Sequence, residues 1–355
     1  MQRPKVKADL VANDGKALHV TRRSLTAPEL PQLKEAAVAR RRSKTTRNTP
    51  EPVEPGEFTA HDYASGTGNR AYKLYVPAPR SGRPRPLLMM LHGCQQDPDD
   101  FAAGTRMNEL ADAHGFLVAY PAQTSRANSA CAWSWFEPLE QEREGAEPSQ
   151  LAGIVGAIAE IHDLDMASVF VAGLSAGAAM AVILGETYPD IFAAVGAHSG
   201  LPWGAAHNVW TAFSAMQRDN PHGTKLRVGT AQTRARSAAW HGVPTIVFHG
   251  DSDRTVAVSN GDAIVEQALH SFPAGTHALR QQAVLPRTST IGHDFTTTRY
   301  LDKAGRTRVE SWAVHGGIHA WSGGSSEGSY TDPEGPDASA EMVRFFLGQH
   351  ARRMN

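Results

Sequence analysis

The sequence has few of the features that would set it apart from ordinary soluble proteins. It has two cysteines in 355 residues, so a disulfide framework is excluded and one bridge is the most that could form. No Cys/His spacing resembles a zinc site, and we expect no metal. No apolar run approaches the roughly 18 residues of a membrane helix, so no membrane partner is expected. A net charge of −1 argues against nucleic acid as the main partner.

The charge is unevenly distributed along the chain. Residues 1–50 carry 12 Lys and Arg against 4 Asp and Glu, a net charge of +8, and the remaining 305 residues carry 23 against 32, a net of −9. The segment 44–58, KTTRNTPEPVEPGEF, has little means of burying apolar surface. We therefore expect residues 1–55 to form a basic, flexible segment and linker, and residues 56–350 to form one folded domain.

The first 20 residues carry positive charge but have neither an apolar core of about 7–15 residues nor a small-residue cleavage site. They do not read as a secretory signal peptide. Two alternatives stay open: a cytoplasmic protein, or a chain that lacks its leader.

From residue 58 onward, short apolar runs alternate with helical patterns. Strands are expected at 72–77, 86–93, 116–121, 168–173, 193–200, 245–251 and 308–315. Most of these runs are apolar throughout, which is typical of a parallel sheet covered by helices on both faces. Helices are expected at 99–115, 148–163, 176–189, 260–271 and 337–350. The alternation predicts an α/β fold with a mostly parallel, doubly wound sheet.

Polar residues follow several of these strands, at the edge where such sheets bind ligands. Ser175 is the centre of GLSAG, which fits the G-x-S-x-G pattern of a nucleophile elbow and stands between an expected strand and helix. Asp251 and Asp253 follow a later strand, and His315 and His319 follow the last one. The chain order Ser, Asp, His is that of the α/β-hydrolases. Alone, the pentapeptide would more often be an ordinary turn than a catalytic one.

The residue types fit nucleophilic catalysis. A serine hydroxyl is a poor nucleophile until an imidazole takes its proton, and the imidazole needs a carboxylate to fix its tautomer. We expect His319 rather than His315 to act, because it lies in a glycine-rich loop past the strand end. The backbone N–H of Ala176 can point at an oxyanion from the helix start. The second donor is expected to be the N–H of Cys94, with Gln95 next.

Other residues near the strand ends are candidates for binding or support. We expect four tryptophans and Gln95 to contact substrate, the indoles forming an apolar slot: Trp133, Trp135, Trp203 and Trp321. The alternative is that each tryptophan packs under a loop. His92 and His249 are expected to build the sheet edge, one of them hydrogen-bonding near the oxyanion loop.

Several motifs in order resemble the polyhydroxybutyrate depolymerase family of esterases, which includes feruloyl and acetyl-xylan esterases. The resemblance covers about residues 58–348 and rests on LMMLHGCQQDPDDFAAGTRMNELADAHGFLVAYPAQ, CAWSWFEP, VFVAGLSAGAAMAVILGETYPDIFAAVGAHSGLPWGAA, PTIVFHGDSDRTV and GGIHAWSGG. It implies an α/β-hydrolase fold and serine ester hydrolysis without a cofactor. It also implies Ser175 as nucleophile, Asp253 as acid in HGDSDRTV and His319 as base in GIHAW.

The resemblance has further implications. It implies a disulfide between Cys94 and Cys131, with two free buried thiols as the alternative. A disulfide favours an oxidising compartment, so the family implies a secreted or periplasmic protein. At Trp203 relatives more often carry tyrosine.

Three functions follow as hypotheses. The first is a polyester or polyhydroxybutyrate depolymerase-type esterase acting as a monomer. The second is a feruloyl or acetyl-xylan esterase. The third is a non-catalytic α/β-hydrolase that serves as a binding protein.

Overall fold

The computed structural model describes residues 56–78, 82–125, 128–217, 242–272, 279–283 and 292–350. The basic segment expected at residues 1–55 lies outside these ranges. The strands are β1 (Glu57–Ser65), β2 (Gly68–Val76), β3 (Arg85–Leu91), β4 (Leu117–Pro121), β5 (Leu164–Leu174), β6 (Ala194–His198), β7 (Thr245–Gly250), β8 (Arg280–Ala283), β9 (Phe295–Leu301), β10 (Thr307–Val314), β11 (Trp321–Ser322) and β12 (Thr331–Asp332).

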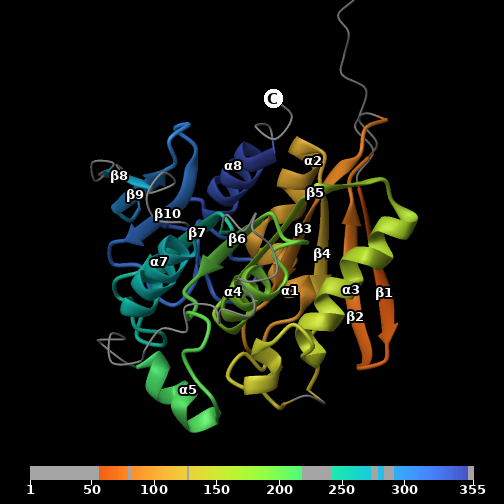
Figure 1. Ribbon diagram of the computed structural model, residues 1–355, viewed down its shortest axis with the longest axis horizontal. Coiled ribbons are helices and arrows are strands. Elements are labelled where there is room, and N and C mark those ends of the chain that lie inside the picture. The colour runs from red at the N-terminus through yellow and green to blue at the C-terminus, as the bar shows by residue number, and fades with distance from the viewer. Residues whose placement is uncertain are drawn as a thin grey trace, which may run out of the picture. The chain divides into compact units, whose positions relative to one another are not determined.

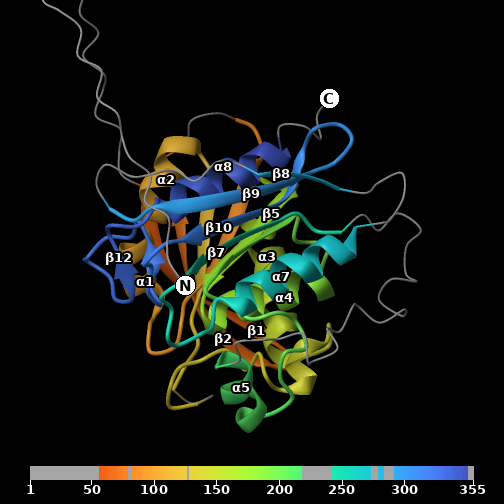
Figure 2. The same ribbon diagram turned by 90° about the vertical axis from the view of Figure 1, so that its left-hand side faces the viewer.

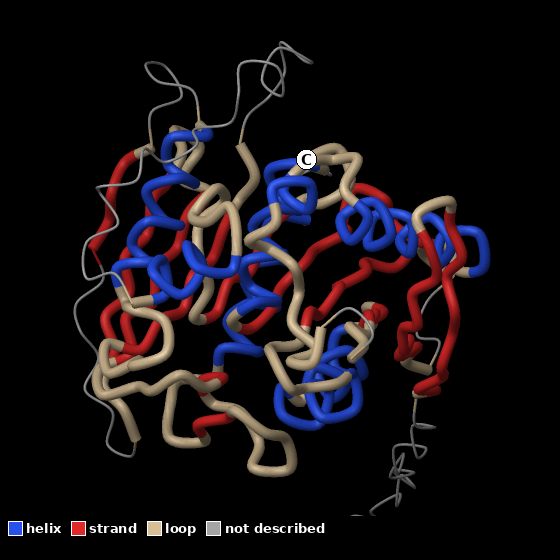
Figure 3. Tube along the Cα trace, turned by 90° about the horizontal axis from the view of Figure 1, so that it is seen from below, coloured by secondary structure: helices blue, strands red, loops and turns tan. Residues whose placement is uncertain are grey.

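The described helices alternate with the central strands, as the sequence predicts. They are α1 (Pro98–Thr105), α2 (Met107–His114), the 3₁₀ turn η1 (Pro138–Gln141), α3 (Ala146–Ile161), α4 (Ala176–Thr187), α5 (Val209–Met216), α7 (Ser259–Ser271) and α8 (Ala338–His350). Figure 3 distinguishes the strands, the helices and the loops that join them. Within the described ranges, no helix is both long and apolar enough to cross a membrane.

Ten of the described strands form one sheet in the order β1-β2-β4-β3-β5-β6-β7-β10-β9-β8 (Figure 1). The six central strands, from β4 to β10, run parallel. Antiparallel pairs continue the sheet at both ends. The predicted mostly parallel sheet is confirmed. The antiparallel outer strands β1, β8 and β9 were not predicted, because they are largely polar and contain no apolar run in the sequence.

Helices cover both faces of the sheet, which confirms the doubly wound arrangement (Figures 1 and 2). Apolar side chains of α3, α4 and α7 pack into one buried cluster with the sheet. Those of α1, α2 and α8 pack into the other. Strands buried between two such layers carry apolar residues at nearly every position, which is the pattern seen in the sequence.

The single helix expected at 99–115 is wrong, because the structure divides it into α1 and α2. The break lies at Arg106, whose φ of 51° is left-handed and ends the first helix. The Arg106 guanidinium hydrogen-bonds the carbonyl of Gly323 at 3.1 Å and the carboxylate of Asp337 at 3.0 Å. These partners lie more than 200 residues further along the chain, so the local sequence could not reveal the break.

Candidate active site

Ser175 stands at a sharp turn between β5 and α4. Its φ of 56° and ψ of −116° lie in a region that side-chain-bearing residues seldom adopt. Its neighbours permit the turn, since a Cβ on Gly177 would lie 2.1 Å from the carbonyl oxygen of Leu91. A Cβ on Gly173 would lie 2.4 Å from the backbone of Gly177. The two glycines of GLSAG are therefore required by close backbone approach, which gives this turn the geometry of a nucleophile elbow.

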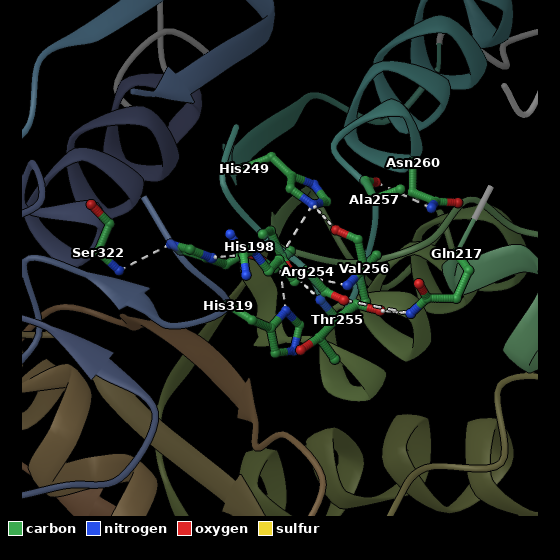
Figure 4. A network of polar contacts seen from close by, with 12 residues as sticks. His198, Gln217, His249, Arg254, Thr255, Val256, Ala257, Asn260, His319 and Ser322 are labelled. Carbon is green, nitrogen blue, oxygen red and sulfur yellow. Dashed lines mark hydrogen bonds and ion pairs between the residues drawn. The ribbon is translucent and has the colours of Figure 1, made fainter. Parts of the chain in front are cut away.

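His319 and Asp253 form a hydrogen-bonded pair. His319 Nδ1 lies 2.7 Å from Asp253 Oδ2, and the side chains are 13% and 0% exposed. Figure 4 shows His319 beside the residues that follow Asp253, Arg254 to Ala257. The other carboxylate oxygen accepts the backbone N–H groups of Thr255 and Val256, each at 2.9 Å. Because the ionised carboxylate can only accept, His319 carries a proton on Nδ1 and leaves Nε2 free to exchange one.

The electrostatic surroundings keep Asp253 ionised. Burial by itself raises the pKa of this carboxyl group, but hydrogen bonds from His249 and His319, the charge of His319 and the Val256 N–H lower it. The lowering effects prevail and hold the pKa of Asp253 well below its usual range. A carboxylate that stays charged can stabilise an imidazolium beside it.

The alternative pair, Asp251 and His315, is also formed but is partly exposed to solvent. His315 Nδ1 is 2.9 Å from Asp251 Oδ2, and each side chain is 43% exposed. Asp251 also accepts the N–H of Gly316 at 2.7 Å, and Thr296 Oγ1 lies 2.8 Å from His315 Nε2. Asp251 therefore ties the loop after β7 to the loop after β10. Burial favours the inner pair as the reacting one, because water screens charges at the outer pair.

The serine and the acid–base pair share one edge of the sheet. Ser175, Asp253 and His319 follow β5, β7 and β10, which run parallel with β6 between β5 and β7. The backbone N–H of Ser175 donates to the carbonyl of His198, the last residue of β6, at 2.9 Å. Parallel strands bring their carboxyl ends to the same edge, where the sequence predicts these side chains.

The loop after β3 and the start of α4 supply backbone donors. Ala176 is the first residue of α4, so its N–H has no partner within the helix. Among the described residues, no backbone hydrogen bond joins the Cys94 N–H to another residue, and the Gly93 N–H donates to the side-chain oxygen of Gln96. The Gln95 N–H donates to the carbonyl of Ala130 at 2.7 Å. Gln95 is thereby removed as the reserve oxyanion donor, and Cys94 and Ala176 remain.

His92 holds this loop in place. Its Nε2 accepts the N–H of Gln123 at 3.0 Å, so the ring proton is on Nδ1, which donates to the Gly93 carbonyl at 2.8 Å. Burial lowers the pKa of His92 and keeps the ring neutral. This is the supporting contact near the oxyanion loop that the sequence predicts for one of the two sheet-edge histidines.

The sequence predicts that four tryptophans form an open apolar slot, but in the structure these side chains are buried. The four side chains are buried, between 0% and 6% exposed: Trp133, Trp135, Trp203 and Trp321. Three indole N–H groups donate to protein acceptors, those of Trp133 to His92, Trp203 to Gln141 and Trp321 to Ser339. These indoles therefore pack beneath the loops. Their sequence position near strand ends could not distinguish packing from an open surface.

Gln95 is the exposed member of the residues expected to bind substrate. Its backbone is left-handed, with φ of 64°, and its side-chain oxygen accepts the Tyr330 hydroxyl at 3.0 Å.

The predicted disulfide is not present, since Cys94 and Cys131 are free thiols. Burial raises the pKa of the Cys94 thiol, and Cys131 raises it further. The two loops are instead joined by the backbone hydrogen bond from Gln95 to Ala130.

Glu147 is a supporting residue that sequence reasoning missed. It lies 5% exposed at the start of α3 and accepts both the N–H and the hydroxyl of Ser134, at 2.8 and 2.9 Å. Burial raises the pKa of Glu147, whereas the Ser134 hydrogen bonds and the charge of Arg70 lower it, and the net direction is upward. Glu147 thus fixes the loop that carries Trp133. A helix-start glutamate carries no sequence signal for this role.

Comparison with known proteins identifies the family to which the chain belongs. Residues 70–283 match the model of the family described as Esterase PHB depolymerase. The chain belongs to this family. It is 32% identical over 263 residues to poly(3-hydroxyalkanoate) depolymerase C of Paucimonas lemoignei, which covers 73% of this chain and 60% of that protein. It is 30% identical over 295 residues to the poly(3-hydroxybutyrate) depolymerase of Ralstonia pickettii, covering 75% and 54%.

Other similar proteins are more distant in sequence. Acetylxylan esterase A of Emericella nidulans is 24% identical over 219 residues, covering 60% of this chain and 70% of that protein. The chain spans a little over half the length of the two bacterial depolymerases. The acetyl xylan esterase from Aspergillus awamori superimposes with a TM-score of 0.57 at 17% identity, covering 82% and 99% of the chains. That structure supports the α/β-hydrolase fold.

Proposed function

We propose that this protein is a serine carboxylic-ester hydrolase whose nucleophile is Ser175, with His319 as base and Asp253 as acid. The observation that carries the proposal is the buried 2.7 Å contact between His319 and Asp253, at the sheet edge where Ser175 occupies a strained turn. An imidazole held by a buried carboxylate is the group that activates a serine hydroxyl for acyl transfer.

The mechanism is a double displacement. Ser175 Oγ attacks the ester carbonyl carbon while His319 Nε2 removes the hydroxyl proton, and Asp253 stabilises the resulting imidazolium. The N–H groups of Ala176 and Cys94 hydrogen-bond the oxyanion of the tetrahedral intermediate. His319 then protonates the leaving alcohol, which departs and leaves the acyl-enzyme. Water repeats the sequence, with His319 as base again, and releases the acid and Ser175.

The proposed substrate class is a short-chain polyester of the polyhydroxybutyrate type. The names of the bacterial relatives support it. So does an exposed apolar surface on α5 and the neighbouring turn, which we call the α5 surface: Leu139, Val209, Trp210 and Phe213, between 46% and 82% exposed. An apolar surface of this kind suits adsorption to an insoluble polymer.

The C-terminal end of α5 contacts the loop that carries Asp253. The carbonyl of Met216, the last residue of α5, accepts the backbone N–H of Ala257 at 2.8 Å. Gln217 donates to the carbonyls of Arg254 and Thr255, as Figure 4 shows. A polymer adsorbed on the α5 surface would therefore lie near the loop that carries Asp253. We also propose that the enzyme is secreted or periplasmic, as the family resemblance implies, and that it acts as a monomer.

The second candidate is a feruloyl or acetyl-xylan esterase, favoured by the acetylxylan esterase relative. The chemistry is the same, and the substrate differs. A purely binding protein is the third hypothesis, and the intact set of Ser175, Asp253 and His319 argues against it.

Two experiments test the proposal. Ser175→Ala should lower hydrolysis of p-nitrophenyl butyrate by on the order of 10⁶; near-normal hydrolysis would exclude Ser175 as nucleophile. The substrate class is tested by comparing release of 3-hydroxybutyrate from amorphous polymer with release of ferulate from methyl ferulate and acetate from acetylated xylan. Faster release from the polymer supports the polyester, and faster release of ferulate or acetate supports the second candidate.

A further inference from the structure

His198, the last residue of β6, joins the two halves of the proposed active site. Its carbonyl accepts the N–H of Ser175 at 2.9 Å. Its Nε2 accepts the N–H of Ser322, three residues after His319, at 3.0 Å. Figure 4 shows the contact with Ser322. One residue is therefore hydrogen-bonded both to the nucleophile and to the loop that carries the base.

The His198 ring is fixed by packing on both faces. It stacks on Phe248 with centroids 5.8 Å apart and planes at 12°, and on Trp321 with centroids 5.2 Å apart and planes at 27°. His198 is 1% exposed, and Nδ1 lies 3.2 Å from the hydroxyl of Ser199. A ring held in this way cannot rotate without displacing Trp321, two residues from His319.

The contacts also define the protonation state of the ring. A backbone N–H can only donate, so Nε2 is unprotonated and the proton is on Nδ1. Burial, followed by the neighbouring His249 and His319, lowers the pKa of His198 to about 3, although the carboxylate of Asp253 acts in the opposite direction. The ring is neutral wherever the enzyme is expected to work, and its acceptor is always available.

We propose that His198 is a positioning residue that sets the distance between Ser175 and His319 through its Nε2 acceptor. The proposal rests on the function proposed above. Without the acceptor, the buried N–H of Ser322 loses its partner, and the loop that carries His319 shifts to find another. Proton transfer depends on alignment so closely that a displacement of about 1 Å can cost on the order of 100-fold in rate.

Three variants separate the acceptor from the packing. His198→Gln places an amide oxygen near the position of Nε2, and His198→Asn places its amide near Nδ1, too short to reach Ser322. The two amides are matched in chemistry and differ in reach. His198→Phe keeps the stacked ring and has no acceptor. Each is assayed with p-nitrophenyl butyrate for kcat and KM, and its melting temperature is measured.

We expect His198→Gln to keep kcat within about fivefold of the native value, and His198→Asn and His198→Phe to lower it by about 10- to 100-fold with KM within about threefold. Equal kcat values for Gln and Asn, or native kcat for Phe, would overturn the proposal. If Phe does not fold, the Gln–Asn pair decides. A native enzyme without esterase activity would instead refute the proposed function, so the two failures are distinguishable.

Discussion

His319 Nδ1 and Asp253 Oδ2 lie 2.7 Å apart, and the Asp253 side chain is fully buried. A second pair two and four residues away in the chain, Asp251 and His315, has nearly the same separation, 2.9 Å, but is 43% exposed at each side chain. Distance does not distinguish the two pairs, whereas burial does. An interaction between charges is several times stronger where water is excluded than in bulk solvent.

The two acids should respond very differently to the same substitution. Asp253→Asn removes the charge that fixes the tautomer of His319, and we expect kcat to fall by on the order of 10⁴. Asp251→Asn is the matched control, and we expect kcat within about threefold and a change in stability below about 1 kcal/mol, because the pair is exposed. Steady-state hydrolysis of p-nitrophenyl butyrate measures both. A larger loss from Asp251→Asn would reverse the assignment.

The elbow should tolerate no side chain at Gly177. Its Cβ would lie 2.1 Å from the Leu91 carbonyl oxygen, so Gly177→Ala should separate α4 from β3, destabilise the fold by about 1–3 kcal/mol and lower kcat by on the order of 100-fold. Gly156→Ala in α3 is the control. A Cβ there meets no atom within 4 Å, and we expect about 0.5–1 kcal/mol of stabilisation with unchanged activity. Urea unfolding and the ester assay provide both readouts. Native behaviour of Gly177→Ala would contradict the close approach.

The sequence predicts Ser175 well because the nucleophile elbow is local. The required glycines, the preceding strand and the following helix all lie within 20 residues of Ser175. Asp253 is harder to assign, since two aspartates follow the same strand and only their pairing with later histidines separates them.

The sequence could not predict features that depend on distant contacts. Trp133 and Trp321 stand near strand ends as a binding residue would, yet both are buried and satisfied by remote acceptors. The strand β1 alternates polar residues at an edge and gives no apolar run. The roles of His198 and Glu147 arise from hydrogen bonds to other loops, which composition does not indicate.

Because the pKa of Asp253 is lowered, the stability of the protein should depend on this residue at neutral pH and less so at acid pH. A carboxyl group whose folded-state pKa is lowered contributes stability above its unfolded value of about 3.9 and loses it as pH falls toward the folded value. We therefore compare the free energy of unfolding of the native protein with that of Asp253→Asn. The difference between the two proteins should be constant from pH 7 to about pH 5 and should shrink progressively as the pH falls below about 4. Urea titrations across that range measure the difference. Convergence already above pH 5 would contradict the lowered pKa.

The α5 surface should matter for polymer and not for small esters. Trp210→Ser and Phe213→Ser remove apolar side chains that are 82% and 62% exposed, and we expect several-fold less 3-hydroxybutyrate released from amorphous polymer with unchanged hydrolysis of p-nitrophenyl butyrate. Ile161→Ser is the matched control, since Ile161 is an apolar residue, 70% exposed, at the end of α3 and outside the α5 surface. An equal loss of polymer hydrolysis in all three variants would contradict a specific role for the α5 surface.

The identity of the nucleophile is tested most directly by covalent labelling. The native protein is treated with a fluorophosphonate, digested, and its peptides are sequenced by mass spectrometry. We expect one phosphonylated residue, Ser175, and no label after Ser175→Ala or after denaturation, because the hydroxyl reacts only when His319 can take its proton. Failure to label the active protein, or a label on another residue that survives Ser175→Ala, would contradict the assignment of Ser175 as nucleophile.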